Sequence, residues 1–344
     1  MSTGGIESHV LAFCEKISSP YVVIDIVVAN FKMRKNEADI LKKYCRKVYF
    51  IQSNSPLTRH FILLKTLFLL QQTKYDVLYT NGSGGSILLV GKLIRHKQWV
   101  LHHHMEFDDK AFAAIDKQYK KALVLADNVI ACSNINAKNM FMYLNRPIDV
   151  VYCFSRNIGQ SIENRELGNQ LHFGYFGRLI PAKGIDLICK LSDDSDCKDI
   201  TFHLWGEGIE YPASFFEQYP NMQYHGVFST AKELQQITSM LDAFLLLTTH
   251  PEGLPISLLE VMSAGVPWLS TNVGGIPDIV CDPLSTRLLD IKDISNYEKI
   301  KASVLRLAAD IRAGIVLKEK QKFFYNVNFS AEILISVWKT MMNI

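Results

Sequence analysis

The sequence predicts an α/β protein built from two doubly wound parallel sheets. Short runs rich in β-branched residues alternate along the chain with longer stretches of helical pattern, which is typical of parallel strands joined by crossover helices. This alternation is interrupted by a polar segment at 157–170 and restarts after it. A length of 344 residues is enough for about two domains. We therefore expect two doubly wound domains joined near 157–170.

The expected strands are short, and each precedes a stretch able to form a helix. Those before the polar segment are Val22–Val28, Val48–Ile51, Asp76–Thr80, Trp99–His103, Asn128–Ala131 and Asp149–Tyr152. Those after it are His172–Phe176, Thr201–Trp205, Gln223–Tyr224, Ala243–Leu247, Trp268–Ser270 and Arg287–Leu289. A last helix is expected over Ser330–Met342, after a turn at Asn326–Asn328, and it is expected to cross back onto the first domain.

Composition excludes several classes of protein. Hydrophobic residues make up 48% and charged residues 21% of the chain, which indicates a folded protein and excludes disorder. The longest apolar stretch, Phe61–Leu70, is interrupted by Lys65 and is too short for a membrane span of ~20 residues. We expect it to be a core helix. Met1–Val10 has no apolar signal-peptide core. The seven cysteines contain no Cys-x-x-Cys, so we expect neither a disulfide framework nor a zinc ribbon, and we expect a reducing cytoplasm.

The charges are distributed unevenly. Residues 1–160 hold 21 Lys and Arg against 12 Asp and Glu, whereas residues 161–344 hold 16 against 22. A basic half indicates nucleic acid, an anionic membrane surface or a phosphate-rich ligand. The basic residues are too scattered among the aromatic ones for nucleic acid. The basic run Arg34–Lys47 is either a solvated helix face or a contact with an anionic membrane.

The segment at 250–280 holds the first candidate site. Glu252 follows an expected strand, and Pro255 is suited to the first turn of a helix that carries Ser257 and Glu260 on one face. A helix start at the carboxyl end of a parallel strand offers free N–H groups to an anion. Glu260 could accept hydrogen bonds from vicinal hydroxyls such as those of ribose, and Glu252 could meet a second polyol. Without a ligand, the same glutamates would only stabilise the helix start.

A second cluster lies in a glycine-rich turn after the expected strand at 172–176. The turn carries Arg178 and Lys183. Turns at this end of a parallel sheet border the crevice where such sheets bind ligands. A planar guanidinium and a compact ammonium together suit a diphosphate, although two basic residues in a turn are also often only exposed to solvent.

Several motifs occur together in a fixed order. They are Gly4–Val10, His102–His104, Ala131–Ser133, Gly177-Arg178 with Lys183-Gly184, Trp205–Gly208, Glu252 with Glu260, Gly265-x-Pro267 and Gly274-Gly275. With this ordered set the chain resembles glycosyltransferase family 4, a retaining family of GT-B fold with a Glu-x7-Glu motif, and in particular bacterial surface-polysaccharide glycosyltransferases. The resemblance implies two facing Rossmann-like domains with a cleft between them. We expect an acceptor-side domain at 1–157, a nucleotide-sugar-binding domain at 158–325, and a C-terminal helix at 326–344 that packs back on the first domain.

The resemblance also implies roles for individual residues. The expected catalytic residues are Glu252, Arg178, Lys183 and His104. The expected donor-binding residues are Glu260, Gly5, Gly177, Gly206, Gly208, Gly253, Leu254, Ser257 and His102. In this scheme the two cations neutralise the diphosphate of the donor, Glu260 holds the ribose, and Glu252 contacts the sugar near its reacting carbon. A histidine of 102–104 lies beside the sugar.

We expect no metal and no cofactor. Asp194-Ser195-Asp196 is the one Asp-x-Asp of the sequence, and its polar surroundings suggest a solvated loop. Alternation on a strand places His102 and His104 on one face and His103 on the other, and no neighbouring cysteine along the chain completes a metal site.

The predicted activity is that of a retaining hexosyltransferase. Its donor is a nucleoside-diphosphate sugar, and its acceptor is a saccharide, expected to be lipid-linked, in O-antigen, capsule or lipopolysaccharide biosynthesis. The expected location is the cytoplasm, peripheral at the inner face of the membrane. Two alternatives stay open: a catalytically inactive or truncated sugar-binding relative, and a nucleotide-sugar epimerase of the same fold. A dinucleotide oxidoreductase is disfavoured, because Gly82-Ser83-Gly84 and Gly206-Glu207-Gly208 both lack the third glycine of the phosphate-binding motif.

The chain departs from the family at its beginning. Family members start with an apolar strand that leads into the glycine pair, whereas here Gly4-Gly5 directly follows Met1-Ser2-Thr3. In a doubly wound sheet that strand is central, so its loss would leave two neighbouring strands without a partner. We expect that the natural product starts upstream or that the chain is a damaged copy.

Overall fold

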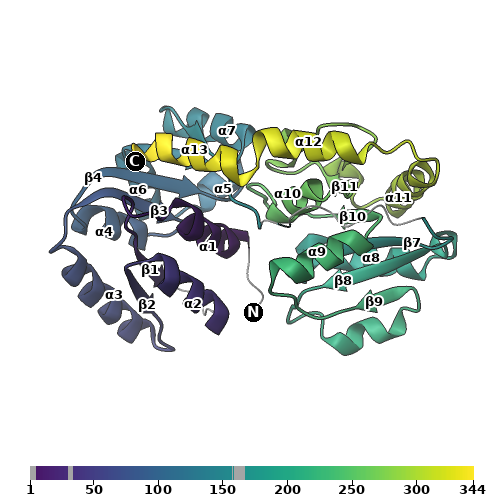
Figure 1. Ribbon diagram of the computed structural model, residues 1–344, viewed down its shortest axis with the longest axis horizontal. Helices are drawn as coiled ribbons and strands as arrows, with labels where there is room; N and C mark the ends of the chain where they lie inside the picture. The colour runs from purple at the N-terminus through teal and green to yellow at the C-terminus, as the bar shows by residue number, and fades with distance from the viewer. Residues whose placement is uncertain (1–4, 30–33, 157, 159–166) are drawn as a thin grey trace. The chain divides into compact units, whose positions relative to one another are not determined.

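The computed structural model describes the chain except residues 1–4, 30–33, 157 and 159–166. The chain folds into two compact units. The N-terminal unit contains Ile6–Phe154 and Ala331–Ile344, and the C-terminal unit contains Ser155–Ser330 together with Gly5. Much of the predicted linker at 157–170 therefore lies outside the described residues. Each unit is an α/β structure in which the paired strands are parallel (Figure 1).

The N-terminal unit is built on two sheets. One has the order β1-β2 and the other the order β3-β4-β5-β6. The strands are β1 (Asp25–Ala29), β2 (Lys47–Ile51), β3 (Tyr75–Asn81), β4 (His96–His103), β5 (Asn128–Ala131) and β6 (Asp149–Val150). In a doubly wound sheet a further strand would lie between β1 and β3.

The gap between the two sheets lies between β1 and β3. The sequence predicts such a gap, because the strand expected between them is absent from the pattern. Among the described residues no strand joins β1 to β3. Side chains connect them instead, since the Tyr75 hydroxyl donates a hydrogen bond to Asp25 at 2.9 Å and Val27 packs in one apolar cluster with Tyr75 and Leu78. The two sheets are thus held together by packing rather than by a continuous backbone ladder.

The helices of this unit are α1 (Gly5–Ile17), α2 (Lys35–Tyr44), α3 (Pro56–Leu70), α4 (Ser86–Leu93), α5 (Asp109–Ala114), α6 (Lys117–Leu125), α7 (Asn134–Leu144) and α13 (Ala331–Met342). Helix α2 packs against β1 and β2, and two core clusters join other helices to the larger sheet. One core cluster joins α4, α6 and α7 to the sheet through Leu88, Tyr119 and Met140. The other joins α1 and α13 through Phe13 and Trp338. The C-terminal helix is therefore part of the N-terminal core.

Helix α3 corrects the prediction that Phe61–Leu70 is a core helix. Leu67 is buried, but Phe61 is 69% and Phe68 67% exposed. With Leu57 and Leu64, both also exposed, these side chains follow helical spacing along one side of α3. The prediction was wrong because an apolar stretch does not show how many of its sides other elements cover.

The C-terminal unit is built on one six-stranded sheet of order β12-β11-β10-β7-β8-β9. Its strands are β7 (Leu171–Phe176), β8 (Ile200–Trp205), β9 (Met222–Tyr224), β10 (Ala243–Leu246), β11 (Trp268–Thr271) and β12 (Thr286–Leu289). Its α-helices are α8 (Ile185–Asp193), α9 (Ala231–Met240), α10 (Ile256–Ser263), α11 (Tyr297–Arg312) and α12 (Lys318–Asn328). The inner strand β10 is buried throughout, as expected of a parallel strand covered on both faces.

The predicted strands agree with the observed ones to within three residues at each end. The predicted turn at Asn326–Asn328 is wrong, because α12 continues through Asn328. The side-chain amide of Asn328 donates a hydrogen bond to the carbonyl of Phe324 at 2.8 Å, so this polar residue bonds within the helix and does not end it earlier.

Within the described residues, every helix is too short or too polar to cross a bilayer.

Candidate functional site

Loops at the carboxyl end of the C-terminal sheet dock on one another through glycines. The backbone N–H of Gly177, after β7, donates to Trp205 at 3.0 Å, and that of Leu179 donates to Glu207 at 3.0 Å. Gly206 has φ +140°, and a Cβ there would collide with the carbonyl oxygen of Gly177. A Cβ on Gly208 would collide with the carbonyl of Leu179. The predicted glycines after β7 and β8 therefore allow two loops to approach closely.

The turn that carries Lys183 is anchored to the loop after β10. Gly184 has the left-handed φ of +76°, and a Cβ there would collide with the carbonyl oxygen of Leu247. The N–H of Thr249 donates to the carbonyl of Ala182 at 2.8 Å. Lys183 ends the short 3-10 helix Pro181–Lys183. Its side chain is thus held at the carboxyl end of β10.

Lys183 and Glu252 form an ion pair in this position (Nζ to Oε1). Their side chains are only 12% and 10% exposed. The hydroxyl of Thr248 donates to the same carboxylate oxygen at 3.1 Å, and the N–H of Gly275 approaches the backbone carbonyl of Glu252 at 3.4 Å. The sequence predicts that Lys183 and Glu252 belong to one site, and the structure places them in direct contact.

Arg178 lies at the edge of the same group of loops. It is exposed, and the Tyr175 hydroxyl donates to its backbone carbonyl at 2.8 Å. Its guanidinium Nη2 lies 3.3 Å from Nε2 of His250. Burial and the nearby Lys183 and Arg178 cations lower the pKa of His250 below 6.5. His250 is therefore neutral at neutral pH and can accept a hydrogen bond from Arg178.

Helix α10 begins directly after the Glu252 loop. Pro255 precedes its first residue, Ile256. Gly253 and Leu254 are buried, whereas Ser257 in the first turn is partly exposed. The N–H of Leu258 in this turn donates to the carbonyl of Pro255 at 3.1 Å. The turn follows the carboxyl end of β10, as the sequence predicts, and the positive end of the helix dipole favours an anion there.

Glu260 lies one turn further along α10 and is paired with Arg156. The Nε of Arg156 donates to Oε1 of Glu260 at 2.6 Å, and Nη2 donates to Oε2 at 3.2 Å. Glu260 is 1% exposed, and the Arg156 guanidinium lies 4.7 Å from the centre of the Phe228 ring. Such a bidentate pair fixes the orientation of the carboxylate.

Sequence reasoning missed Arg156, Thr248 and His250. Thr248 directly follows the predicted strand Ala243–Leu247, and His250 begins the segment 250–280, so their position after a predicted strand was the available signal. Arg156 is 104 residues before Glu260, and no local pattern connects the two.

The other predicted residues are Gly5, His102 and His104. Gly5 is the first residue of α1 and is grouped with the C-terminal unit. His102 lies near the end of β4, and His104 directly follows that strand. Both belong to the N-terminal unit. His102 and His104 share one face, with ring centres 3.9 Å apart, while His103 contacts the hydroxyl of Tyr119 on the other face at 3.0 Å. The predicted alternation is confirmed.

The Asp-x-Asp motif is exposed to solvent at Ser195 and Asp196, as expected, and its carboxylates also pair with a cation. Lys301 Nζ lies 3.2 Å from Asp194 and 2.9 Å from Asp196. The Tyr297 hydroxyl also donates to Asp194 at 2.8 Å. These carboxylates are therefore occupied by an ion pair that ties η2 (Ser195–Cys197) to α11.

Comparison with known sequences adds a family and two relatives. The family model described as "Glycosyl transferases group 1" matches residues 160–313. An uncharacterized glycosyltransferase of Methanocaldococcus jannaschii is 24% identical over 262 residues, which cover 68% of this chain and 73% of that protein. An uncharacterized 41.2 kDa protein in the cps region of Klebsiella pneumoniae is 24% identical over 290 residues, covering 75% and 79%.

Comparison with solved structures identifies the fold. HepE of Anabaena, solved in complex with UDP and glucose, matches with a TM-score of 0.74 and 16% identity over 100% of this chain and 97% of that one. The structural neighbours are GT-B glycosyltransferases, so the predicted GT-B fold is confirmed. By sequence, the chain is thus similar to glycosyl transferases of group 1 over residues 160–313 and to an uncharacterized glycosyltransferase over 68% of its length.

Proposed function

We propose that the protein is a retaining glycosyltransferase that moves a hexose from a nucleoside-diphosphate sugar to a saccharide acceptor in surface polysaccharide assembly. The observation that carries the proposal is the arrangement around Glu252. Two cations, Arg178 and Lys183, and the start of α10 meet at the carboxyl end of one parallel sheet. A relative in a cps region supports the pathway, and a neighbour solved with UDP and glucose supports the type of donor.

The charge requirement of the reaction explains why cations lie there. Transfer of the sugar leaves negative charge on the departing nucleoside diphosphate. We propose that Arg178, Lys183 and the first-turn N–H groups of α10 stabilise this charge, since such preorganised donors are worth about 2.7–4 kcal/mol each in the transition state. The carboxylates of Asp194 and Asp196 are already paired with Lys301, so we propose that no metal takes part at this site.

The acidic residues have separate proposed roles. Glu252 contacts the donor sugar, and its ion pair with Lys183 holds both side chains in place before the donor binds. Glu260 receives the ribose hydroxyls. Its two oxygens keep free lone pairs beside the bonds from Arg156. Gly177, Gly206 and Gly208 let the backbone approach the nucleotide.

The test compares cationic variants with a matched control. Wild-type protein is first screened against UDP- and GDP-sugars by thermal shift, because a ligand at 100 times its Kd stabilises the folded state by ~2.7 kcal/mol. In a direct transfer assay with the donor found, Arg178→Ala and Lys183→Ala are each expected to lose about 100-fold or more in turnover. The control Lys198→Ala removes an exposed cation just before β8, at the opposite end of the sheet, and should keep normal turnover.

Two results would contradict this proposal. Near-normal turnover by Arg178→Ala or Lys183→Ala would show that the substituted cation does not stabilise the departing nucleoside diphosphate. Donor binding without transfer to any acceptor tried would favour the alternative of an inactive sugar-binding relative.

We also propose that the acceptor is lipid-linked and that the N-terminal unit contacts an anionic membrane. Support comes from two features of that unit, on helices that pack against opposite faces of the two-stranded sheet. Helix α2 carries the exposed Lys42 and Lys43, and α3 exposes the apolar side chains of Phe61, Leu64 and Phe68. Basic and apolar groups together give binding to an anionic interface.

Vesicle sedimentation tests the membrane contact. We expect binding to vesicles that contain anionic lipid and much weaker binding to neutral ones. The variant Phe61→Ser/Phe68→Ser should lower binding, whereas the control Val124→Ser/Leu125→Ser, which changes exposed apolar residues on α6, should not. Equal binding to neutral vesicles, or no effect of the α3 variant, would refute it.

A further inference from the structure

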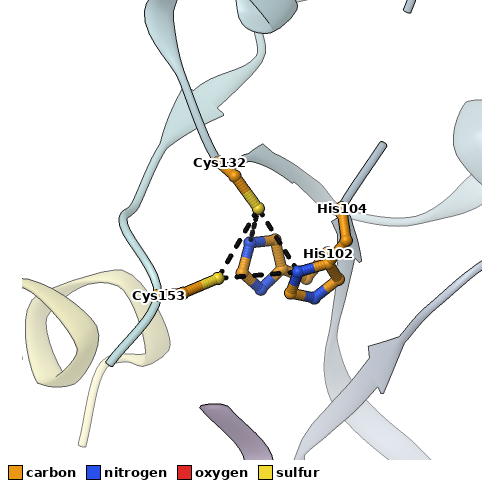
Figure 2. A group of neighbouring side chains, drawn as sticks. All are labelled: His102, His104, Cys132 and Cys153. Atoms are coloured by element: carbon orange, nitrogen blue, oxygen red, sulfur yellow. Dashed lines mark hydrogen bonds between the residues drawn. The ribbon is translucent and has the colours of Figure 1, made fainter. Parts of the chain in front are cut away.

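Four metal-ligand side chains meet at the carboxyl end of the N-terminal sheet. We name His102, His104, Cys132 and Cys153 the His–Cys cluster (Figure 2). The two histidines come from the end of β4, and the cysteines follow β5 and β6, which are the next strands in the sheet. The search for a neighbouring cysteine along the sequence did not find Cys132 and Cys153, which the fold places beside the two histidines. Cysteines that are distant in the sequence become neighbours because the ends of parallel strands meet at one edge.

Four of the six distances between the ligand atoms are close to those expected around one ion. From Cys132 Sγ, the separations are 3.1 Å to His102 Nε2, 3.3 Å to His104 Nδ1 and 3.6 Å to Cys153 Sγ. Cys153 Sγ lies 3.5 Å from His104 Nδ1, and all four atoms lie within 4.8 Å of one another. A tetrahedral zinc ion, with bonds of about 2.3 Å to sulfur and about 2.0 Å to nitrogen, holds its ligand atoms roughly 3.3–3.8 Å apart.

The surroundings orient the ligands as metal sites require. The Tyr79 hydroxyl lies 2.8 Å from Nδ1 of His102, which directs Nε2 of that ring toward the cysteines. Second contacts of this kind commonly fix the orientation of a metal-bound histidine.

We propose that the His–Cys cluster binds a single zinc ion in a structural site. Two sulfur and two nitrogen ligands in tetrahedral reach favour zinc. An iron–sulfur cluster spreads its protein ligands over more than one iron, whereas here one sulfur lies within 3.6 Å of the other three ligand atoms. Four protein ligands fill the tetrahedron and leave no position for a catalytic water. Among the described residues, no other group of three or more such ligands is found.

If the cluster binds zinc, His102 and His104 differ in whether they can also contact the sugar, the role that the sequence assigns to both. His102 would use Nε2 for the metal and Nδ1 for Tyr79, which leaves neither nitrogen for a sugar. His104 would use Nδ1, and its Nε2 is buried without a hydrogen-bond partner among the described residues. Of the two, only His104 keeps a donor for a ligand.

Metal analysis of the purified full chain tests the proposal. Protein produced with added zinc is expected to retain about one zinc per chain after dialysis. Cys132→Ser and Cys153→Ser should each reduce the content to less than about a tenth of that. The control is Cys14→Ser/Cys45→Ser, because these two thiols are also buried in contact with one another in the N-terminal unit but lack neighbouring histidines. It should retain its zinc.

A second measurement does not depend on the folding of variants. Zinc is removed from the wild-type chain with a chelator, and Co²⁺ is added. Tetrahedral cobalt with thiolate ligands gives intense absorption, and zinc should displace it and restore the lost Tm.

Wild-type protein that is well folded yet takes up neither metal would overturn the proposal, as would equal zinc in the Cys14→Ser/Cys45→Ser and Cys132→Ser proteins. A Cys132–Cys153 disulfide, detected by mass, would also overturn it. None of these readouts depends on glycosyl transfer, so this proposal and the proposed function can fail separately.

Discussion

Buried charges of the candidate site are held by partners that come from distant parts of the chain. Glu260 is almost fully buried, and the guanidinium of Arg156 bonds both of its oxygens. Removing one partner of such a pair leaves an uncompensated charge, which costs more than the pair itself contributes. Arg156 therefore matters for the ribose role proposed for Glu260 as well as for folding.

This leads to a prediction for Arg156→Ala. We expect a loss of about 2–3 kcal/mol in the free energy of unfolding, because Glu260 is left buried without its cation while the partly open position of Arg156 moderates the cost. We also expect KM for the donor to rise more than kcat falls. Urea denaturation and steady-state kinetics measure both. The double variant Arg156→Ala/Glu260→Gln should recover part of the stability, and no recovery would contradict the explanation.

His250 gives a prediction for pH dependence. Its pKa in the folded protein lies below the ordinary 6.5, so as the pH falls below 6.5 the unfolded chain takes up a proton before the folded one does. His250 therefore contributes no pH dependence above about 6.5, and it lowers stability progressively below that pH. Between pH 7.5 and 5.5, His250→Gln should lose less free energy of unfolding than the wild type, as measured by urea denaturation. An equal loss would show that His250 does not cause this dependence.

At the scale of elements, the site depends on glycines that let loops touch. Gly184 and Gly314 both have left-handed backbones, with φ of +76° and +68°. A Cβ at Gly184 would collide with the Leu247 carbonyl, whereas nothing lies within 4 Å of one at Gly314. Alanine at Gly314 therefore measures the cost of the left-handed backbone alone, whereas alanine at Gly184 measures that cost together with the cost of the collision.

We predict that Gly184→Ala destabilises the protein more than Gly314→Ala does. The change at Gly314 should cost about 1 kcal/mol, the strain of a left-handed residue with a side chain. Gly184→Ala should cost about 2 kcal/mol more, because the turn carrying Lys183 must move away from β10. Denaturation curves give the two values, and similar losses would contradict the role given to the close approach.

At the scale of the whole molecule, the chain returns to its first unit at the end. Trp338 of α13 is fully buried, packs with Phe13 and Leu334, and donates a hydrogen bond from Nε1 to the carbonyl of Tyr152 at 3.2 Å. The twelve-residue helix α13 is thus part of the core next to the His–Cys cluster. The ring centre of Trp338 lies 5.3 Å from that of His102.

Trp338→Ala is therefore expected to unfold the N-terminal unit more easily. Loss of this side chain should cost about 3–5 kcal/mol through lost burial and the cavity it leaves. The neighbouring Val337→Ala, at a position that is 38% exposed, should cost less than about 1 kcal/mol. Chemical denaturation measures both. If the two losses were equal, α13 would not be part of the core.

The sequence by itself determined the alternation of strands and helices, and with it the α/β class and nearly all strand positions, because side-chain period and turn residues are local properties. It also placed Lys183, Glu252 and Glu260 in one region, since the residues after parallel strands collect at one edge. The tertiary structure alone decided which side of α3 stays exposed, which cation pairs with Glu260, and that Cys132 and Cys153 approach His102 and His104. Those contacts depend on strand order and on packing between segments more than twenty residues apart, and no local pattern contains that information.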